Sequence, residues 1–150
     1  ASCLVGSEMC IRDSIYGDGK QQRCFSYIDD CLYCLNALAF QDNVVGEVIN
    51  IGPDEEPITI NELAEACANE TGLNLDPIHH KDRPKEVKLA VCSSDKARDL
   101  LGYNTATNMR QSVKKTAEYI RTRGTKKFQY HLPLEIINDQ TPDTWKKKLI

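Results

Sequence analysis

The sequence lacks the features of several classes of protein. Its 150 residues carry a formal net charge of −3, whereas general nucleic-acid binders are usually strongly basic. It has no apolar run close to the roughly 20 residues that a membrane span needs, and no basic stretch followed by an apolar one, as a secretory signal has. Its seven cysteines are an odd number without the spacing of a disulfide framework. We therefore expect a cytoplasmic protein with free thiols and without nucleic-acid or membrane partners.

Two motifs that support redox chemistry are also missing. A dinucleotide-binding G-x-G-x-x-G loop needs a third glycine between a strand and a helix, and Gly17-x-Gly19 has neither. Tyr16 and Lys20 have the spacing of a Tyr-x-x-x-Lys pair, which works when one helical turn brings the ammonium to the phenol. Two glycines around an aspartate disfavour a helix here. We therefore predict no catalytic and no cofactor-binding residue in this chain.

The middle of the chain alternates short strands and helices, which is an α/β pattern. Strands are expected at residues 22–28, 47–51, 77–80 and 87–91, and helices at 29–41, 59–72, 95–101 and 109–123. Asp29 or Asp30 is expected to cap the first helix, and Thr59 with Glu62 to form a capping box at the second. The first helix carries an apolar stripe of Leu32, Leu35, Leu38 and Ala39.

The two ends differ from this middle part. Residues 1–14 show neither helical nor strand periodicity, and the string CLVGSEMCIRDS resembles a translated sequencing adapter. We interpret 1–14 as a non-native leader, the alternative being an ordinary disordered terminus. Residues 15–124 are expected to form one domain, and 125–150 a partly irregular tail with apolar segments around 128–134 and Trp145.

The most specific stretch is IYGDGKQQRCFSYIDD, residues 15–30. A Gly-Asp-Gly turn precedes Arg23, whose guanidinium offers a fixed fork of donors that suits phosphate oxygens. The stretch resembles the substrate-binding part of the extended short-chain dehydrogenase/reductases, the NAD-dependent nucleotide-sugar epimerases and dehydratases such as UDP-glucose 4-epimerase. The corresponding motif of that family is G-D-G-x-Q-x-R-D-F-x-Y-V-x-D.

Four further segments resemble the same family, in the order and at the spacing found there. They are GEVINIG at 46–52, TINELAE at 59–65, DRPKEV at 82–87 and SSDKARDLLGY at 93–103. The resemblance implies the C-terminal, substrate-binding portion of an extended Rossmann-type enzyme whose NAD-binding core is missing from this chain. It also implies a homodimeric parent enzyme that passes a hydride from a sugar carbon to NAD and later returns it.

The resemblance assigns roles to four residues. Arg23 and Arg83 match the two arginines that bind the diphosphate of a nucleotide sugar, and together they would neutralise its charge. Glu86 matches an acidic position that approaches the nucleotide ribose. Tyr16 lies where the family's strand edge borders the nucleobase, a role its backbone would perform.

Two residues depart from the family's motifs. Cys24 stands in place of the aspartate that follows the first arginine, which removes a carboxylate able to orient Arg23. Lys85 stands in place of the glycine of R-P-G, so a side chain occupies a position where the family has a flexible backbone. Neither change removes an arginine.

Two other functions stay open at this stage. A stand-alone module could bind a phosphorylated ligand without chemistry, and Cys31-x-x-Cys34 could belong to a metal or redox site, although His79 and His80 are adjacent and point apart on a strand. If the chain is a fragment, we expect the segment 48–51 and the apolar stripe of the first helix to lack partners.

Overall fold

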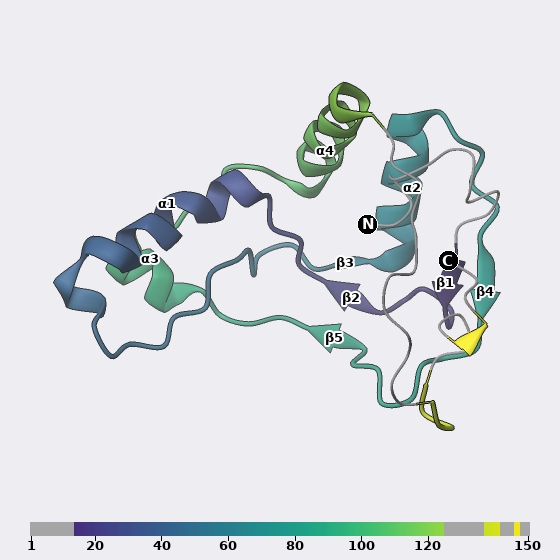
Figure 1. Ribbon diagram of the computed structural model, residues 1–150, viewed down its shortest axis with the longest axis horizontal. Helices are drawn as coiled ribbons and strands as arrows, with labels where there is room; N and C mark the ends of the chain where they lie inside the picture. The colour runs from purple at the N-terminus through teal and green to yellow at the C-terminus, as the bar shows by residue number, and fades with distance from the viewer. Residues whose placement is uncertain (1–13, 125–136, 142–145, 148–150) are drawn as a thin grey trace.

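The computed structural model describes residues 14–124, 137–141 and 146–147. In this part of the chain, five short strands alternate with four α-helices and one 3₁₀ helix, which confirms the α/β class (Figure 1). The helices are α1 (Ile28–Phe40), the 3₁₀ helix η2 (Asp42–Val44), α2 (Ile60–Thr71), α3 (Asp95–Leu101) and α4 (Met109–Arg123). The strands are β1 (Ser14–Tyr16), β2 (Gln22–Arg23), β3 (Ile58–Thr59), β4 (Ile78–His80) and β5 (Leu89–Ala90). Among the described residues, no helix combines the length and the apolar character that crossing a bilayer requires.

The strands form two small sheets. β1 pairs in parallel with β4, so that Tyr16 lies opposite His80. β2 pairs with β3 in the antiparallel sense and with β5 in the parallel sense, which places Arg23 between Ile58 and Ala90. Figure 1 shows α1 and α3 at one end of the molecule, α2 and α4 towards the other, and the three-stranded sheet between them. The pairing of β1 begins at Ser14, the last residue of the expected leader, whereas residues 1–13 lie outside the described part of the chain.

The strand expected at 47–51 is wrong, and the one expected at 22–28 is shortened to Gln22–Arg23. A β-branched run such as Val48-Ile49 favours a strand only when another strand supplies the ladder hydrogen bonds. Neither 47–51 nor 24–28 has a ladder partner among the described residues, and the side chain of Val48 is 84% exposed. The expectation that 48–51 lacks partners is therefore correct only for the ladder and for Val48, because Ile49 and Ile51 pack against the apolar core described below.

The helix ends follow local signals in two places and a tertiary contact in a third. The capping box of Thr59 and Glu62 is confirmed, and α4 has the expected bounds. The expected cap of α1 is wrong, because the N-cap is Tyr27, without a side-chain cap bond. Asp30 is buried instead, and its carboxylate accepts from the backbone N–H of Thr107 at 2.8 Å and from its hydroxyl at 2.9 Å. This contact joins α1 to the segment that enters α4.

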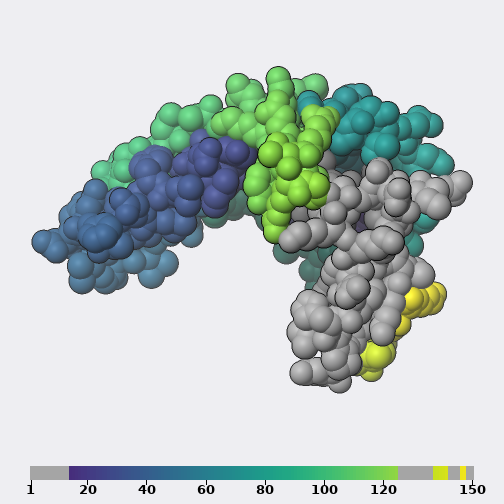
Figure 2. Space-filling view, turned by 45° about the horizontal axis from the view of Figure 1, so that its top comes forward, coloured from purple at the N-terminus to yellow at the C-terminus, as the bar shows by residue number. Residues whose placement is uncertain are grey.

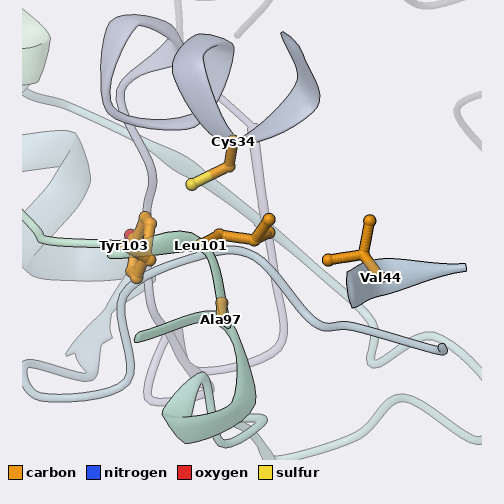
Figure 3. Packing of buried hydrophobic residues seen from close by; sticks show 5 residues of the cluster. All are labelled: Cys34, Val44, Ala97, Leu101 and Tyr103. Carbon is orange, nitrogen blue, oxygen red and sulfur yellow. The ribbon is translucent and has the colours of Figure 1, made fainter. Parts of the chain in front are cut away.

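A small apolar core joins α1, η2 and α3. It consists of Cys34, Val44, Ala97, Leu101 and Tyr103, each at most 7% exposed. Figure 3 shows Cys34 pointing from α1 towards Leu101 and Tyr103. Because Cys34 and Ala97 are fully buried, this face of α1 is the packed one.

The opposite face of α1 is uncovered in this chain. Leu32 and Leu35 are 50% and 52% exposed, and Phe40 at the end of the helix is 81% exposed. Figure 2 shows the blue segment that contains α1 as an arm projecting away from α2 and α4. The expectation that the stripe lacks partners is confirmed for the described part of the chain.

We expect this face to make the isolated chain self-associate, because exposed contiguous apolar surface promotes association. Leu35→Lys should lower the average mass measured by sedimentation velocity at a given chain concentration. Asn36→Lys is the matched control, since it adds the same charge at the next exposed position of α1 without removing apolar surface. A monomeric wild-type chain with a sharp two-state unfolding transition would contradict this expectation.

Candidate functional site

The Gly-Asp-Gly turn connects the two sheets and fixes the direction in which β2 leaves β1. The N–H of Gly17 donates to the carbonyl of His80 at 2.8 Å, and the N–H of Lys20 donates to Oδ1 of Asp18 at 3.0 Å. Gly17 and Gly19 both have a positive φ, of 68° and 70°. Tyr16 and Lys20 are thus separated by a turn and do not share a helix face, which confirms that they are not a helical Tyr-x-x-x-Lys pair.

Arg83 lies against Tyr16, although the two residues are far apart in the sequence. Its Cζ is 4.0 Å from the centroid of the tyrosine ring, and the rings of Tyr16 and His80 are 5.5 Å apart. Such a cation–π contact holds a guanidinium over a ring while its N–H edge stays available to other partners. The stack forms part of the wall of a cavity of about 290 Å³. Its lining residues are Tyr16, His80, Lys81, Asp82, Arg83, Pro84, Asp139 and Thr141.

Arg23 is half-buried on β2, and its guanidinium bonds to two backbone carbonyls. Nη1 donates to the carbonyl of Gln22 at 2.7 Å, and Nη2 donates to that of Val87 at 2.7 Å. These bonds engage two of the five N–H donors of the group. Val87 follows the segment that begins with Arg83. One loop therefore carries Arg83 at its start and binds Arg23 at its end. Arg23 is not among the residues that line the cavity beside Arg83, and the convergence of both arginines on one diphosphate stays a prediction.

The loop from Arg83 to Val87 contains a tight turn. The N–H of Glu86 donates to the carbonyl of Arg83 at 3.4 Å, and Lys85 has a φ of 59°. That left-handed conformation costs a residue with a side chain about 1–2 kcal/mol, which gives a physical reason for glycine at the matching position of the family. Glu86 is half-buried beside these residues, and its contact with a ribose stays a prediction.

A second cavity, of about 530 Å³, lies beyond the end of β2 and was not predicted from the sequence. Phe25, two residues after Arg23, forms part of its wall. The other lining residues are Pro53, Glu55, Glu56, Asn104, Thr105, Ala106, Thr107, Asn108, Met109 and Gln111. The only local signal for this cavity is the acidic run that follows Gly52-Pro53, because its remaining wall comes from the segment that enters α4.

An ion-pair network joins the loop at Asp54 and Glu55, beside this second cavity, to α3. Arg98 of α3 donates to the carboxylates of Asp54, Glu55 and Asp95. The backbone N–H of Ser94 also donates to Asp54, at 2.8 Å. The hydrogen bonds from Arg98, followed by the one from Ser94, lower the pKa of Asp54 from 3.8 to about 2. The same network raises the pKa of Arg98.

This network predicts a defined loss of stability in acid. Because the folded-state pKa of Asp54 lies below its unfolded value, ionised Asp54 stabilises the fold above about pH 4, and this contribution is lost as the pH falls from 3.8 towards 2. Asp54→Asn should therefore lower the thermal unfolding midpoint at neutral pH and bring it close to that of the wild type in acid. Asp99→Asn, an exposed carboxylate on α3, is the control. Parallel pH profiles for wild type and Asp54→Asn would contradict the assignment.

The cysteine and histidine residues give no support to a metal centre in the described part of the chain, where no three ligand-type side chains group together. Cys34 is fully buried and Cys31 half-buried. His79 lies 2.8 Å from the carbonyl of Gly17 through Nδ1, and His80 lies 3.2 Å from the hydroxyl of Ser14 through Nε2. Both rings therefore join β4 to the β1 segment.

Known proteins with a similar sequence or fold indicate the class that this chain resembles. No protein-family model matches the chain. UDP-N-acetyl-alpha-D-glucosaminuronate decarboxylase from Bacillus cytotoxicus is 30% identical over 113 residues, which cover 71% of this chain and 35% of the relative. GDP-mannose 3,5-epimerase from Arabidopsis thaliana is 29% identical over 121 residues, covering 81% and 31%. The crystal structure of UDP-glucuronic acid 4-epimerase from Bacillus cereus, in complex with UDP-glucuronic acid and NAD, superposes with a TM-score of 0.66 at 31% identity, covering 74% and 35%.

The resemblance seen in the motifs is thus confirmed: in sequence and in fold, the chain is similar to NAD-dependent nucleotide-sugar epimerases and dehydratases of the extended short-chain dehydrogenase/reductase type. The chain spans only about a third of the length of these relatives. The structures of the Bacillus cereus epimerase are complexes with NAD, but the described residues of this chain include no strand–helix junction with the glycine pattern that holds a dinucleotide.

Proposed function

We propose that this chain is the nucleotide-sugar-binding portion of an NAD-dependent nucleotide-sugar epimerase or dehydratase. In this account the binding domain is the expected segment 15–124, extended by one residue to include Ser14 of β1. The observation that carries the proposal is the placement of Arg83 over Tyr16 at the wall of a cavity, on a loop whose far end is bonded to Arg23. The similarity to enzymes that act on UDP- and GDP-sugars supports the same conclusion.

The proposed binding mode follows from the chemistry of a nucleoside diphosphate. The diphosphate carries negative charge, and guanidinium groups bind phosphate oxygens through paired N–H donors. Arg83 is already held over a ring, and Arg23 is held by two carbonyls, so each loses little freedom when the ligand binds. Glu86 accepts from the ribose hydroxyls, and the backbone at Tyr16 borders the base.

The remaining chemistry belongs to the complete enzyme. Bound NAD would supply the acceptor and donor of a hydride, and a tyrosine–lysine pair outside this chain would move the proton. The complete enzyme is proposed to be a cytoplasmic homodimer whose ligand is a nucleotide sugar. The role of this chain is to bind and orient that ligand.

Calorimetric titration tests the proposal on the protein that contains this chain. Uridine diphosphate should bind, and uridine should bind more weakly by a large factor, since most of the proposed contacts are made to the diphosphate. Equal affinity for the two compounds would overturn the diphosphate site, and no binding of either uridine diphosphate or guanosine diphosphate would overturn the proposed function.

A second candidate function is a binding module that holds a phosphorylated ligand without chemistry. The lack of both redox motifs in this sequence favours it. The gene sequence upstream of the codon for residue 15 separates the two functions. A G-x-x-G-x-x-G loop and a helical Tyr-x-x-x-Lys pair in the same reading frame indicate the enzyme, whereas a stop codon followed at once by a native start indicates the module.

A further inference from the structure

The cavity beside Arg83 is lined in part by residues of the C-terminal segment 137–141. Asp139 and Thr141 form the wall of this cavity of about 290 Å³ together with Tyr16 and Arg83. Small-molecule sites usually enclose about 300–1,000 Å³, so this cavity has room for part of a nucleotide and not for a whole nucleotide sugar. Because the backbone at Tyr16 is proposed to border the base, the part that we assign to the cavity is the base with its ribose.

A turn from Asn138 to Thr141 holds the backbone of Asp139 in place. The N–H of Thr141 donates to the carbonyl of Asn138 at 3.2 Å, and the N–H of Asn138 donates to the hydroxyl oxygen of Thr141 at 3.1 Å. The N–H of Gln140 donates to Oδ1 of Asn138 at 2.9 Å. None of these bonds uses the Asp139 carboxylate, whose Oδ2 accepts a long bond of 3.4 Å from the Gln140 side chain. Its Oδ1 accepts no hydrogen bond from the residues that the structure describes, so this oxygen is available to a ligand.

The other carboxylate of the wall, Asp82, is already engaged. Its Oδ2 lies 3.7 Å from Nζ of Lys88, and its Oδ1 lies so close to Gly17 that a Cβ at that glycine would be 1.9 Å from it. Asp139 is therefore the acceptor that the wall offers to a ligand. The same wall also carries two cationic donors, Lys81 and Arg83.

These groups match one kind of nucleobase. A carboxylate can only accept hydrogen bonds, and guanine presents two neighbouring donors, N1–H and N2–H₂, that fit its two oxygens. Uracil presents a single N–H between two carbonyl oxygens, which repel a carboxylate. Lysine and arginine side chains donate to O6 and N7 of guanine. We propose that Asp139 binds the N1–H and N2–H₂ edge of guanine and makes the site selective for GDP-sugars over UDP-sugars, an inference that rests on the proposed function.

Calorimetric titration of the protein that contains this chain, with guanosine, inosine and uridine diphosphates, tests the selectivity. Inosine diphosphate differs from guanosine diphosphate only in lacking the N2 amino group. The wild type should bind guanosine diphosphate about 10-fold more tightly than either of the others, which is the scale of discrimination that one bidentate contact to a base gives. Asp139→Asn keeps the shape of the exposed side chain but not its charge, and should bind the three compounds with similar affinity. Asp99→Asn, which changes an exposed carboxylate on α3, is the control and should keep the wild-type preference.

The possible outcomes separate this inference from the proposed function. Equal affinities of the wild type for guanosine and uridine diphosphates, or a preference that Asp139→Asn retains, would overturn the selectivity and leave the diphosphate site standing. An equal loss of affinity for all three compounds in Asp139→Asn would also overturn it, because the carboxylate would then contact the ribose or the fold and not the base. No binding of either guanosine or uridine diphosphate to the wild type would overturn the proposed function itself.

Discussion

Arg83→Ala weakens the binding of uridine diphosphate by about 1.5–3 kcal/mol, or about 10- to 150-fold, in the protein that contains this chain, because a hydrogen bond to a charged group is worth about that much. The alanine variant loses both the guanidinium and its stack on Tyr16. The affinity for uridine should change much less, since uridine has no diphosphate. Calorimetry with both ligands measures the two effects separately.

Arg123→Ala is the matched control for this experiment. Arg123 on α4 also lies over a tyrosine ring, with its Cζ 5.9 Å from the centroid of Tyr119, and both residues are exposed. This variant removes an exposed arginine and a cation–π contact away from the candidate site, so the affinity for uridine diphosphate should stay unchanged. Equal affinities of wild type and Arg83→Ala would remove Arg83 from the site.

Gly19→Ala destabilises the fold by about 1.5–3.5 kcal/mol. A left-handed backbone costs alanine about 1–2 kcal/mol, and Gly19 has a φ of 70°. The added Cβ would also lie 1.9 Å from Oδ1 of Asn61, whose side-chain amide donates to the carbonyl of Asp18 at 3.0 Å. Moving the Asn61 side chain therefore breaks one of the hydrogen bonds between the turn and α2, at a further cost of about 0.5–1.5 kcal/mol. Denaturant unfolding of wild type and variant measures the sum.

Gly46→Ala separates the two parts of this loss. Gly46 has a φ of 81°, but an added Cβ would meet no atom within 4 Å. It should therefore cost only the backbone part. In an Asn61→Ala background, Gly19→Ala should cost about as much as Gly46→Ala, because the clashing side chain is gone. An unchanged cost of Gly19→Ala in that background would show that Asn61 is not the cause.

The elements predictable from the sequence are those whose signals are local. Thr59 and Glu62 are three residues apart, and the side chain of each accepts a hydrogen bond from the backbone N–H of the other. They therefore mark the start of α2 without tertiary information. Asp30 carries an equally good local signal, but its carboxylate is bound by Thr107, far along the chain. The run at 47–51 has a high strand propensity, but propensity does not supply the neighbouring strand that a ladder needs.

In the candidate site, too, only the features with local sequence signals could be predicted. The types of residue could be predicted, because the Gly-Asp-Gly turn before Arg23 and the Arg83-Pro84 pair are contiguous motifs. The contacts of these residues could not be predicted, because Arg23 bonds to a carbonyl 64 positions away and the loop residue Arg83 stacks on Tyr16 of β1. The second cavity escaped prediction since its walls come from three separate segments.

The central claim is that the guanidinium groups of Arg23 and Arg83 bind the same diphosphate. The most direct test follows the side-chain Nε–Hε signals of the arginines by NMR during a titration with uridine diphosphate, with assignments from Arg23→Lys and Arg83→Lys. The account predicts that the Arg23 and Arg83 signals shift together along one binding curve while that of Arg123 stays in place. Movement of only one of the two signals, or of neither, would contradict it.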